Sequence, residues 1–152
     1  MKISTILIIL IFMFIMFMGG EFTKSGLDWY HSLKLPPGTP PAIVFSIVWL
    51  FLYTLIAICL VRIWKTKPKQ FGLIMTLFVL NGLFNLAWSY LFFTQKRMLI
   101  AFIDLCFLWV SIGFIICLTY RSSKLNAYLL LPYALWTAYA GYLNLGLWWL
   151  NH

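Results

Sequence analysis

Long runs of hydrophobic residues separated by short polar segments make up most of this chain. The runs cover residues 3–20, 42–64, 71–93, 98–120 and 125–150. A helix needs about 20 mostly apolar residues to cross the ~30 Å hydrocarbon core of a bilayer, and each run is close to that length or longer. The pattern therefore predicts an all-α membrane protein, a bundle of five transmembrane helices within a single domain, residues 1–152.

The first run is similar to the hydrophobic core of a signal peptide, because it follows Lys2 and ends at Gly19-Gly20. A signal peptide would carry an A-x-A-like cleavage site after this core. No such site precedes Glu21, and further apolar runs follow. We therefore interpret the first run as a retained helix.

The connection between the first two runs, about residues 19–41, is a long and proline-rich loop. It contains Trp29-Tyr30 and the segment Leu35–Pro41, whose prolines exclude a regular helix. Two interpretations are open. The loop is either an interfacial segment anchored by Trp and Tyr at the level of the headgroups, or a stiff cover over one end of the bundle.

The composition excludes a soluble globule. Hydrophobic residues make up 64% of the chain and charged residues 9%, whereas roughly a quarter of the residues in a soluble domain are charged. The net charge of +8 would suggest nucleic acid in a soluble protein. Here the basic residues flank the apolar runs, so they indicate membrane topology, and we expect no nucleic-acid partner.

The basic residues are unequally divided between the two membrane sides. The N-terminal side would carry seven of them, namely Lys2, Arg62, Lys65, Lys67, Lys69, Arg121 and Lys124. The side of the first loop would carry four, namely Lys24, Lys34, Lys96 and Arg97. Since basic residues are in excess on the cytoplasmic side of membrane proteins, we expect a cytoplasmic N-terminus and an outward first loop. The charge count does not distinguish between membranes, but the lack of an N-terminal extension before the first run leads us to expect a bacterial plasma membrane.

Polar residues inside the runs are informative, because in lipid each needs a partner or a water-lined cavity. Asp104 is the only carboxylate within a predicted span, ~8 Å from the start of that span at 1.5 Å per residue. Counted in the same way from the end of each span, seven residues fall in the half of the membrane beneath the first loop. They are Trp49, Tyr53, Asn85, Trp88, Asp104, Ala140 and Asn144.

An apolar, aromatic-walled site with a few polar groups is typical of a small-molecule pocket. By the same count Trp136 lies past the midplane, so either it forms the floor of that pocket or the predicted end of the last span is misplaced. The alternative is that Asn81 and Asn85 only bind a neighbouring helix, as Asn often does in membrane bundles. The small residues Ala134, Ala138 and Gly141 would permit close helix approach and a homodimer.

Metal chemistry finds no support in the sequence. The two histidines, His31 and His152, lie in the first loop and at the last position, so a paired-His site for metal or haem cannot form within one chain. The three cysteines lie inside apolar runs without metal-like spacing and are interpreted as small buried hydrophobes. We therefore expect no metal and no required cofactor.

Together, these motifs resemble the TspO/translocator protein family, also called peripheral-type benzodiazepine receptors, over nearly the whole chain. The matching positions are Trp29-Tyr30, Leu33, Pro40-Pro41, Phe45, Val48-Trp49, Leu52-Tyr53, Leu80-Asn81, Asn85, Trp88, Asp104, Leu131-Pro132-Tyr133, Trp136, Ala140 and Leu143-Asn144. The resemblance implies five transmembrane helices, commonly in a homodimer, with a pocket beneath the first loop.

The resemblance also implies a function. Such a chain would be a membrane receptor for porphyrin or other haem-type tetrapyrroles and for benzodiazepine-type drugs, acting in tetrapyrrole or stress regulation. The pocket residues implied are Tyr30, Pro40, Trp49, Tyr53, Asn85, Trp88, Asp104, Trp136 and Ala140. Asn144 joins this set from the depth count alone.

Two alternative functions remain open. Bacterial family members are associated with light-dependent porphyrin breakdown, for which Trp49 and Trp136 would be the catalytic residues. A small-molecule transporter would use Asp104 to couple protons, although the chain shows no internal repeat of the kind common in transporters.

The chain departs from the family pattern at two places. Gly38 stands where the family often has an aromatic residue, which predicts that the first loop covers the pocket more loosely. Animal family members carry a sterol-associated pattern at the end of the last span, in which a basic residue follows a tyrosine. No basic residue follows Tyr142 here, so sterol binding is not favoured.

Overall fold

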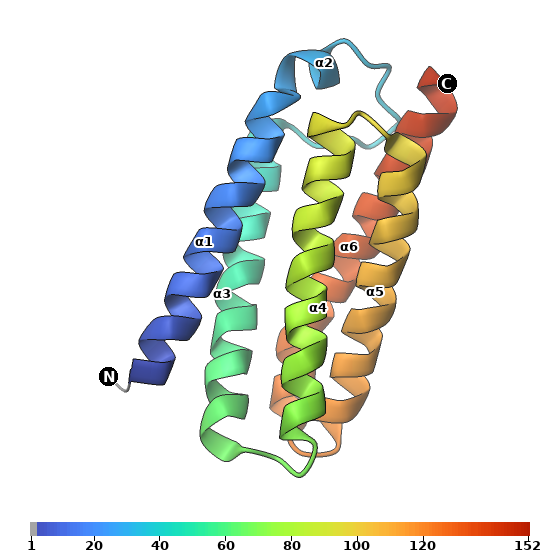
Figure 1. The fold of residues 1–152 in the computed structure, drawn as a ribbon. Helices are drawn as coiled ribbons and strands as arrows, with labels where there is room; N and C mark the ends of the chain where they lie inside the picture. The colour runs from blue at the N-terminus through green and yellow to red at the C-terminus, as the bar shows by residue number, and fades with distance from the viewer. Residues whose placement is uncertain (1–2) are drawn as a thin grey trace.

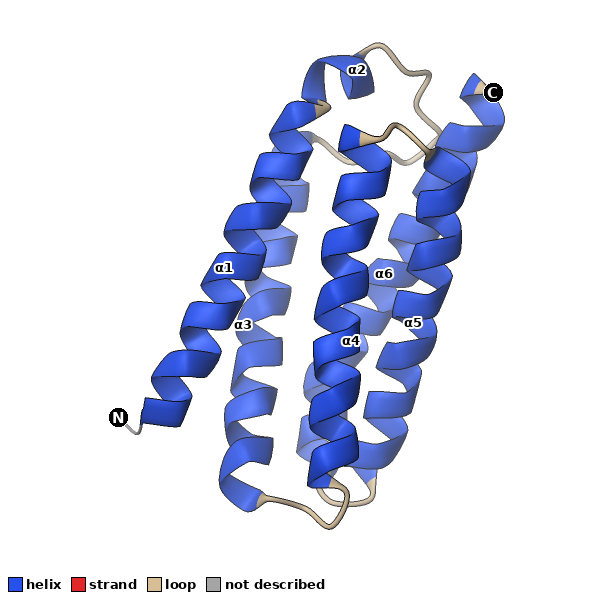
Figure 2. Cartoon of the chain, viewed as in Figure 1, coloured by secondary structure: helices blue, strands red, loops and turns tan. Residues whose placement is uncertain are grey.

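The computed structural model describes residues 3–152, and within them every regular element is a helix (Figure 2). The long helices lie side by side (Figure 1) and are α1 (Ile3–Ser25), α3 (Ala42–Thr66), α4 (Phe71–Ser89), α5 (Met98–Tyr120) and α6 (Lys124–Asn151). A short helix, α2 (Leu27–His31), follows α1, and a π-helical turn, η1 (Tyr90–Thr94), continues α4. The predicted all-α class is therefore confirmed for the described residues.

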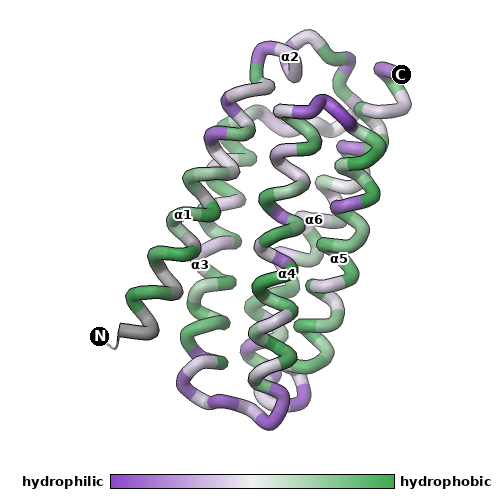
Figure 3. Tube along the Cα trace, viewed as in Figure 1, coloured by the Kyte–Doolittle hydropathy of each residue, from purple (hydrophilic) through white to green (hydrophobic). Residues whose placement is uncertain are grey.

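Among residues 3–152, three helices are both long and apolar enough to cross a bilayer. They are α3, α4 together with η1, and α5. Their outward side chains are large and apolar, as Ile47, Val79 and Phe107 illustrate. Polar residues gather at the two ends of the bundle, while the middle is mostly hydrophobic with a few polar positions (Figure 3). This distribution is the one that a hydrocarbon core requires.

Helix α1 extends beyond the predicted segment 3–20. It continues through Gly19-Gly20 and ends at Ser25, because a glycine costs only about 1 kcal/mol in a helix and does not stop it. Gly26, the residue after the helix, lies so close to the backbone carbonyl of Phe93 that a Cβ atom there would clash. The connection after α1 is therefore shorter than predicted, and α2 occupies its first part.

The remainder of the first loop runs down the side of α6. Its contacts are with successive turns of that helix: Lys34 with Asn151, Pro36 with Gly146, Pro37 with Tyr142 and Gly38 with Tyr139. From residue 151 to residue 139 this descent covers ~18 Å at 1.5 Å per residue. Helix α3 consequently begins well below the end of α6, as Figure 1 shows.

This descent corrects the depth count for α3, which assumed that all spans start at one level. Trp136, halfway along α6, is level with the first turn of α3, and its ring contacts that of Phe45 with centroids 5.4 Å apart. Trp136 therefore does not lie beneath the first residues of α3. Trp49 and Tyr53 lie correspondingly deeper than counted.

Close packing is concentrated around α5, which lies against α4 and α6, whereas α1 covers the space between α3 and α4. The small residues of α6 are part of this packing. The Trp109 indole of α5 donates a hydrogen bond to the Ala134 carbonyl, 3.0 Å, and a Cβ atom at Gly141 would lie 3.7 Å from Leu105. Ala134 and Gly141 thus contact α5 of the same chain, and the homodimer stays a prediction.

Candidate functional site

A buried polar network ties α4, α5 and α6 together. The amide nitrogen of Asn81 donates to the Ser111 hydroxyl at 2.8 Å, and its oxygen accepts from the Tyr133 hydroxyl at 3.0 Å. The Ser111 hydroxyl in turn donates to the Leu108 carbonyl at 2.6 Å. We call Asn81, Ser111 and Tyr133 the lower layer. Because each group has a partner, this layer is structural, in agreement with the helix-binding alternative for Asn81.

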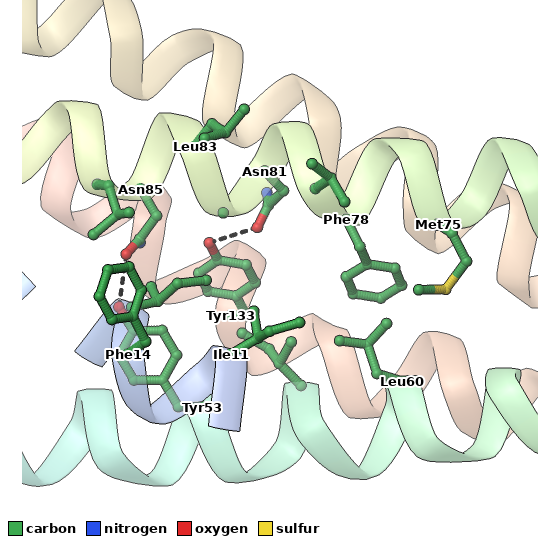
Figure 4. A pocket seen from close by; sticks show the side chains of 15 residues that line it. Ile11, Phe14, Tyr53, Leu60, Met75, Phe78, Asn81, Leu83, Asn85 and Tyr133 are labelled. Atoms are coloured by element: carbon green, nitrogen blue, oxygen red, sulfur yellow. Dashed lines mark hydrogen bonds between the residues drawn. The ribbon is translucent and has the colours of Figure 1, made fainter. Parts of the chain in front are cut away.

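One turn nearer the first loop, Asn85 has a different environment. Its side-chain oxygen accepts a hydrogen bond of 2.6 Å from the Tyr53 hydroxyl, which joins α4 to α3 (Figure 4). Its amide nitrogen is buried and has no hydrogen-bond partner. Asn85 is therefore only half satisfied, in contrast to Asn81.

Aromatic rings from α3 and α6 surround this position. The Trp49 ring stacks on that of Tyr53 with centroids 5.4 Å apart and meets the Tyr133 ring edge-on at 6.2 Å. On the side of the first loop, Trp136 lies between Phe45 and Tyr139. These rings form an apolar wall of the kind that binds planar ligands.

Asp104 lies two turns before Ser111 on α5, on the face that contacts α4 at Asn81. Its Oδ2 atom is buried and has no hydrogen-bond partner, and the same holds for the indole nitrogen of Trp136. We call Asn85, Asp104 and Trp136 the upper layer. Each of its members brings a buried polar atom without a partner, from α4, α5 and α6 respectively.

A second group of predicted residues lies at the junction of α4, α5 and α6. The Trp88 indole donates to the Asn144 side-chain oxygen at 2.9 Å, and the Asn144 nitrogen donates to the Met98 carbonyl at 2.7 Å. Trp88 also stacks on Phe92 of η1, at 5.6 Å. Asn144 and Trp88 are thus satisfied by each other and hold the start of α5.

The two loop residues of the predicted set lie apart from each other. Tyr30, on α2, packs against the rings of Phe92 and Phe93, and burial raises the pKa of its phenol. Pro40 lies half-buried just before α3. Ala140 is buried in α6. The structure therefore brings Trp49, Tyr53 and Asn85 together and joins Trp88 to Asn144. Tyr30 is linked to Trp88 through the rings of Phe92 and Phe93.

A cavity beside this site has a volume of about 300 Å³ and lies between α1, α3 and α4, with Tyr133 of α6 also among its lining residues (Figure 4). Of the predicted residues, only Tyr53 and Asn85 line it. Most of its wall is apolar and was not predicted, as with Phe14, Met75 and Phe78. Apolar residues in apolar spans carry no distinguishing signal, so sequence reasoning had no means of finding them.

These features define a class of protein: a polytopic helical membrane protein with a cavity and partly unsatisfied polar groups inside its bundle. A sequence profile of the TspO/MBR family matches residues 6–150. The chain therefore belongs to the TspO/MBR family, which confirms the resemblance seen in its motifs.

Individual relatives agree with this assignment. The tryptophan-rich protein TspO of Bacillus cereus is 33% identical over 147 residues, which cover 95% of this chain and 94% of that protein. The translocator protein of Bos taurus is 32% identical over 136 residues, or 87% and 80% of the two chains. Protein CrtK of Rhodobacter capsulatus is 31% identical over 127 residues, or 81% and 78%.

Proposed function

We propose that this protein is a membrane receptor that binds a porphyrin or another tetrapyrrole, and benzodiazepine-type drugs, between its helices beneath the first loop. Its role would lie in tetrapyrrole or stress regulation. The observation that carries the proposal is the upper layer. Among the described residues, the buried side-chain polar atoms without a partner are Asn85 Nδ2, Asp104 Oδ2 and Trp136 Nε1, and all three residues belong to the predicted ligand-binding set.

Such atoms are costly, because a buried polar group without a hydrogen bond loses about 1–3 kcal/mol. A bound ligand would recover this loss. The amide of Asn85 and the indole of Trp136 are donors, suited to the carboxylate groups of a porphyrin, whereas the carboxylate of Asp104 is suited to a pyrrole N–H. The rings of Trp49 and Trp136 would stack on the macrocycle.

Titration of the purified protein with protoporphyrin IX tests the proposal. The absorbance of the porphyrin reports binding, and we expect Trp49→Phe and Trp136→Phe each to weaken the affinity about tenfold, which corresponds to ~1.4 kcal/mol. Trp149→Phe is the matched control, because Trp149 is exposed on α6 away from both rings. Equal affinities for all three variants would remove the tryptophans from the proposal.

Light-dependent porphyrin breakdown is a second candidate, favoured by the tyrosines that accompany both tryptophans. Trp49 stacks on Tyr53, and Trp136 contacts Tyr139 at 5.6 Å, so an oxidised indole would have an electron donor beside it. Illumination with porphyrin and dioxygen would then give a new absorbing product that Trp49→Phe and Trp136→Phe abolish. The same product in protein-free micelles would contradict this candidate.

We also propose that α1 and α6 cross the membrane with the other three long helices, because they run beside them along the bundle (Figure 1). The excess of basic residues would place the N-terminus in the cytoplasm and the first loop outside a bacterial plasma membrane. A membrane-impermeant maleimide should then label Lys34→Cys in intact cells and Lys67→Cys only after lysis. The opposite pattern would reverse the orientation.

A further inference from the structure

A separate hollow lies at the loop end of the bundle, where α5 begins and α6 ends. Its volume is about 440 Å³, and it is open to the surroundings. The residues that carry its chemistry are Lys96, Arg97, Leu99, Ile100, Trp148 and His152. None of them belongs to the predicted ligand-binding set, so this hollow is distinct from the proposed tetrapyrrole site.

The two cations of this hollow are not neutralised within the described residues. Among the described residues, the ion pair that forms joins Lys24 to Glu21 on α1, outside the hollow, and no carboxylate lies within 4.0 Å of Lys96 or Arg97. The Lys96 ammonium lies 5.9 Å from the centre of the Trp29 ring, a cation–π contact that leaves its charge in place. The hollow thus presents two positive charges to an incoming anion.

The backbone fixes the position of both cations. The amide of Gln95 donates to the Tyr90 carbonyl and that of Arg97 donates to the Leu91 carbonyl, each at 2.9 Å. Between them, Lys96 takes a φ of +57°, in the left-handed region that is uncommon for residues other than glycine. The cations therefore stand on an ordered turn at the end of η1.

Apart from Asn151, the rest of the hollow is apolar or aromatic. Leu99 and Ile100 are exposed on the first turn of α5. At the end of α6, the His152 ring stacks on that of Trp148 with centroids 4.9 Å apart. Tryptophan at the end of a membrane helix is typical of the headgroup level. Positive charge beside apolar side chains at this level complements an anionic lipid, which has a charged head and a hydrocarbon tail.

We propose that this hollow binds the phosphate group of an anionic phospholipid such as phosphatidylglycerol. Lys96 and Arg97 contact the phosphate, and the upper part of an acyl chain lies along Leu99 and Ile100. Inorganic phosphate has the same charged chemistry but cannot use the apolar wall, which is why the geometry favours the lipid. The site is independent of tetrapyrrole binding and stands if that proposal fails.

Native mass spectrometry of the full chain in neutral detergent tests this site, with phosphatidylglycerol and phosphatidylcholine of identical acyl chains as the probes. We expect one phosphatidylglycerol to bind more tightly than phosphatidylcholine. Lys96→Asn with Arg97→Gln should weaken phosphatidylglycerol binding at least about tenfold, because each basic residue near a membrane surface contributes several-fold. Asparagine is chosen for position 96 because it tolerates positive φ.

The opposite end of the bundle supplies a matched control. Lys67 also has positive φ, at +41°, so Lys67→Asn with Lys65→Gln removes the same charge from a similar backbone. This pair should keep the preference for phosphatidylglycerol, and so should Arg97→Lys. Melting temperatures establish that the variants are folded, and Arg97→Gln alone replaces the double variant if that one unfolds.

Three results would overturn the proposal. First, the preference for phosphatidylglycerol would be unchanged when the cations at 96 and 97 are removed. Second, this preference would fall equally in both double variants, which would indicate non-specific attraction. Alternatively, inorganic phosphate would displace phosphatidylglycerol at equal concentration, which would make free phosphate the ligand.

Discussion

The lower and upper layers of the bundle differ in how completely their polar side chains are hydrogen-bonded, although they are only one to two helical turns apart. In the lower layer, Asn81, Ser111 and Tyr133 are hydrogen-bonded to one another. In the upper layer, Asn85, Asp104 and Trp136 each keep a buried atom without a partner. The same residue type, asparagine, occurs in both layers on one face of α4, so chemistry alone does not decide its role.

The difference separates structure from binding. A fully connected polar network fixes how helices pack, because every alternative packing would leave one of its groups unpaired. A buried polar group that is only partly hydrogen-bonded lowers the stability of the protein, and a reversibly bound ligand is the simplest explanation for it. The lower layer therefore accounts for the arrangement of α4, α5 and α6, and the upper layer is where we propose that the ligand binds.

Substitution of the two asparagines should show the largest difference in stability between the two layers. Asn81→Ala removes the bond to Ser111 and leaves the buried Tyr133 hydroxyl without its acceptor, so we expect a loss of about 2–3 kcal/mol in stability. Asn85→Ala removes an unpaired donor together with the bond to Tyr53, and the loss should be about 1 kcal/mol. Thermal unfolding in one detergent measures both. Equal melting temperatures would show that the two layers do not differ.

Asp104→Asn should change stability in the opposite direction. An unpaired carboxylate within a membrane span is costly, and an amide of the same shape carries no charge, so we expect a gain of about 1 kcal/mol. Asp28→Asn, on exposed α2, is the control and should leave the melting temperature unchanged. A lower melting temperature for Asp104→Asn would mean that the carboxylate already has a stabilising partner.

The smallest effect is expected for Ser111→Ala. The Asn81 nitrogen loses its bond to the hydroxyl but keeps the Leu108 carbonyl at 3.5 Å, so the cost should be about 0.5–1 kcal/mol. Ser122→Ala is the control, since Ser122 bonds only the Thr119 carbonyl of its own turn. A loss as large as that of Asn81→Ala would place Ser111 at the centre of the network.

Much of the fold follows from the sequence, because runs of about 20 apolar residues leave the backbone little choice but helix. The ends of the helices were harder to predict. Nothing local indicates that α1 continues to Ser25 or that η1 forms at Tyr90–Thr94. The two segments meet where Gly26 packs against the backbone of Phe93, which is distant in sequence. The level of α3 was mispredicted for a similar reason: the descent of Pro36 along α6 depends on Gly146, which is distant in sequence.

The site was predictable in its residues more than in its geometry. Intramembrane polar residues are few, so Asp104 and Asn85 stand out in the sequence. Their hydrogen-bond status does not, because it depends on whether a partner such as Ser111 lies opposite on another helix. The cavity beside α1 was missed because its wall consists of apolar residues such as Phe14 and Phe78. Gly38 has a backbone conformation that favours glycine, because its φ is +84°. Its carbonyl accepts a hydrogen bond from Tyr139, which ties the first loop to α6.

The affinity of the folded protein for protoporphyrin IX, compared between one variant of each layer, tests the central claim most directly. Asn85→Ala removes one of the two unpartnered donors of the upper layer, and Ser111→Ala should change the stability of the protein by a comparable amount. We predict that Asn85→Ala binds about tenfold more weakly than the unchanged protein, while Ser111→Ala stays within about twofold. Equal affinities for both variants would contradict the account.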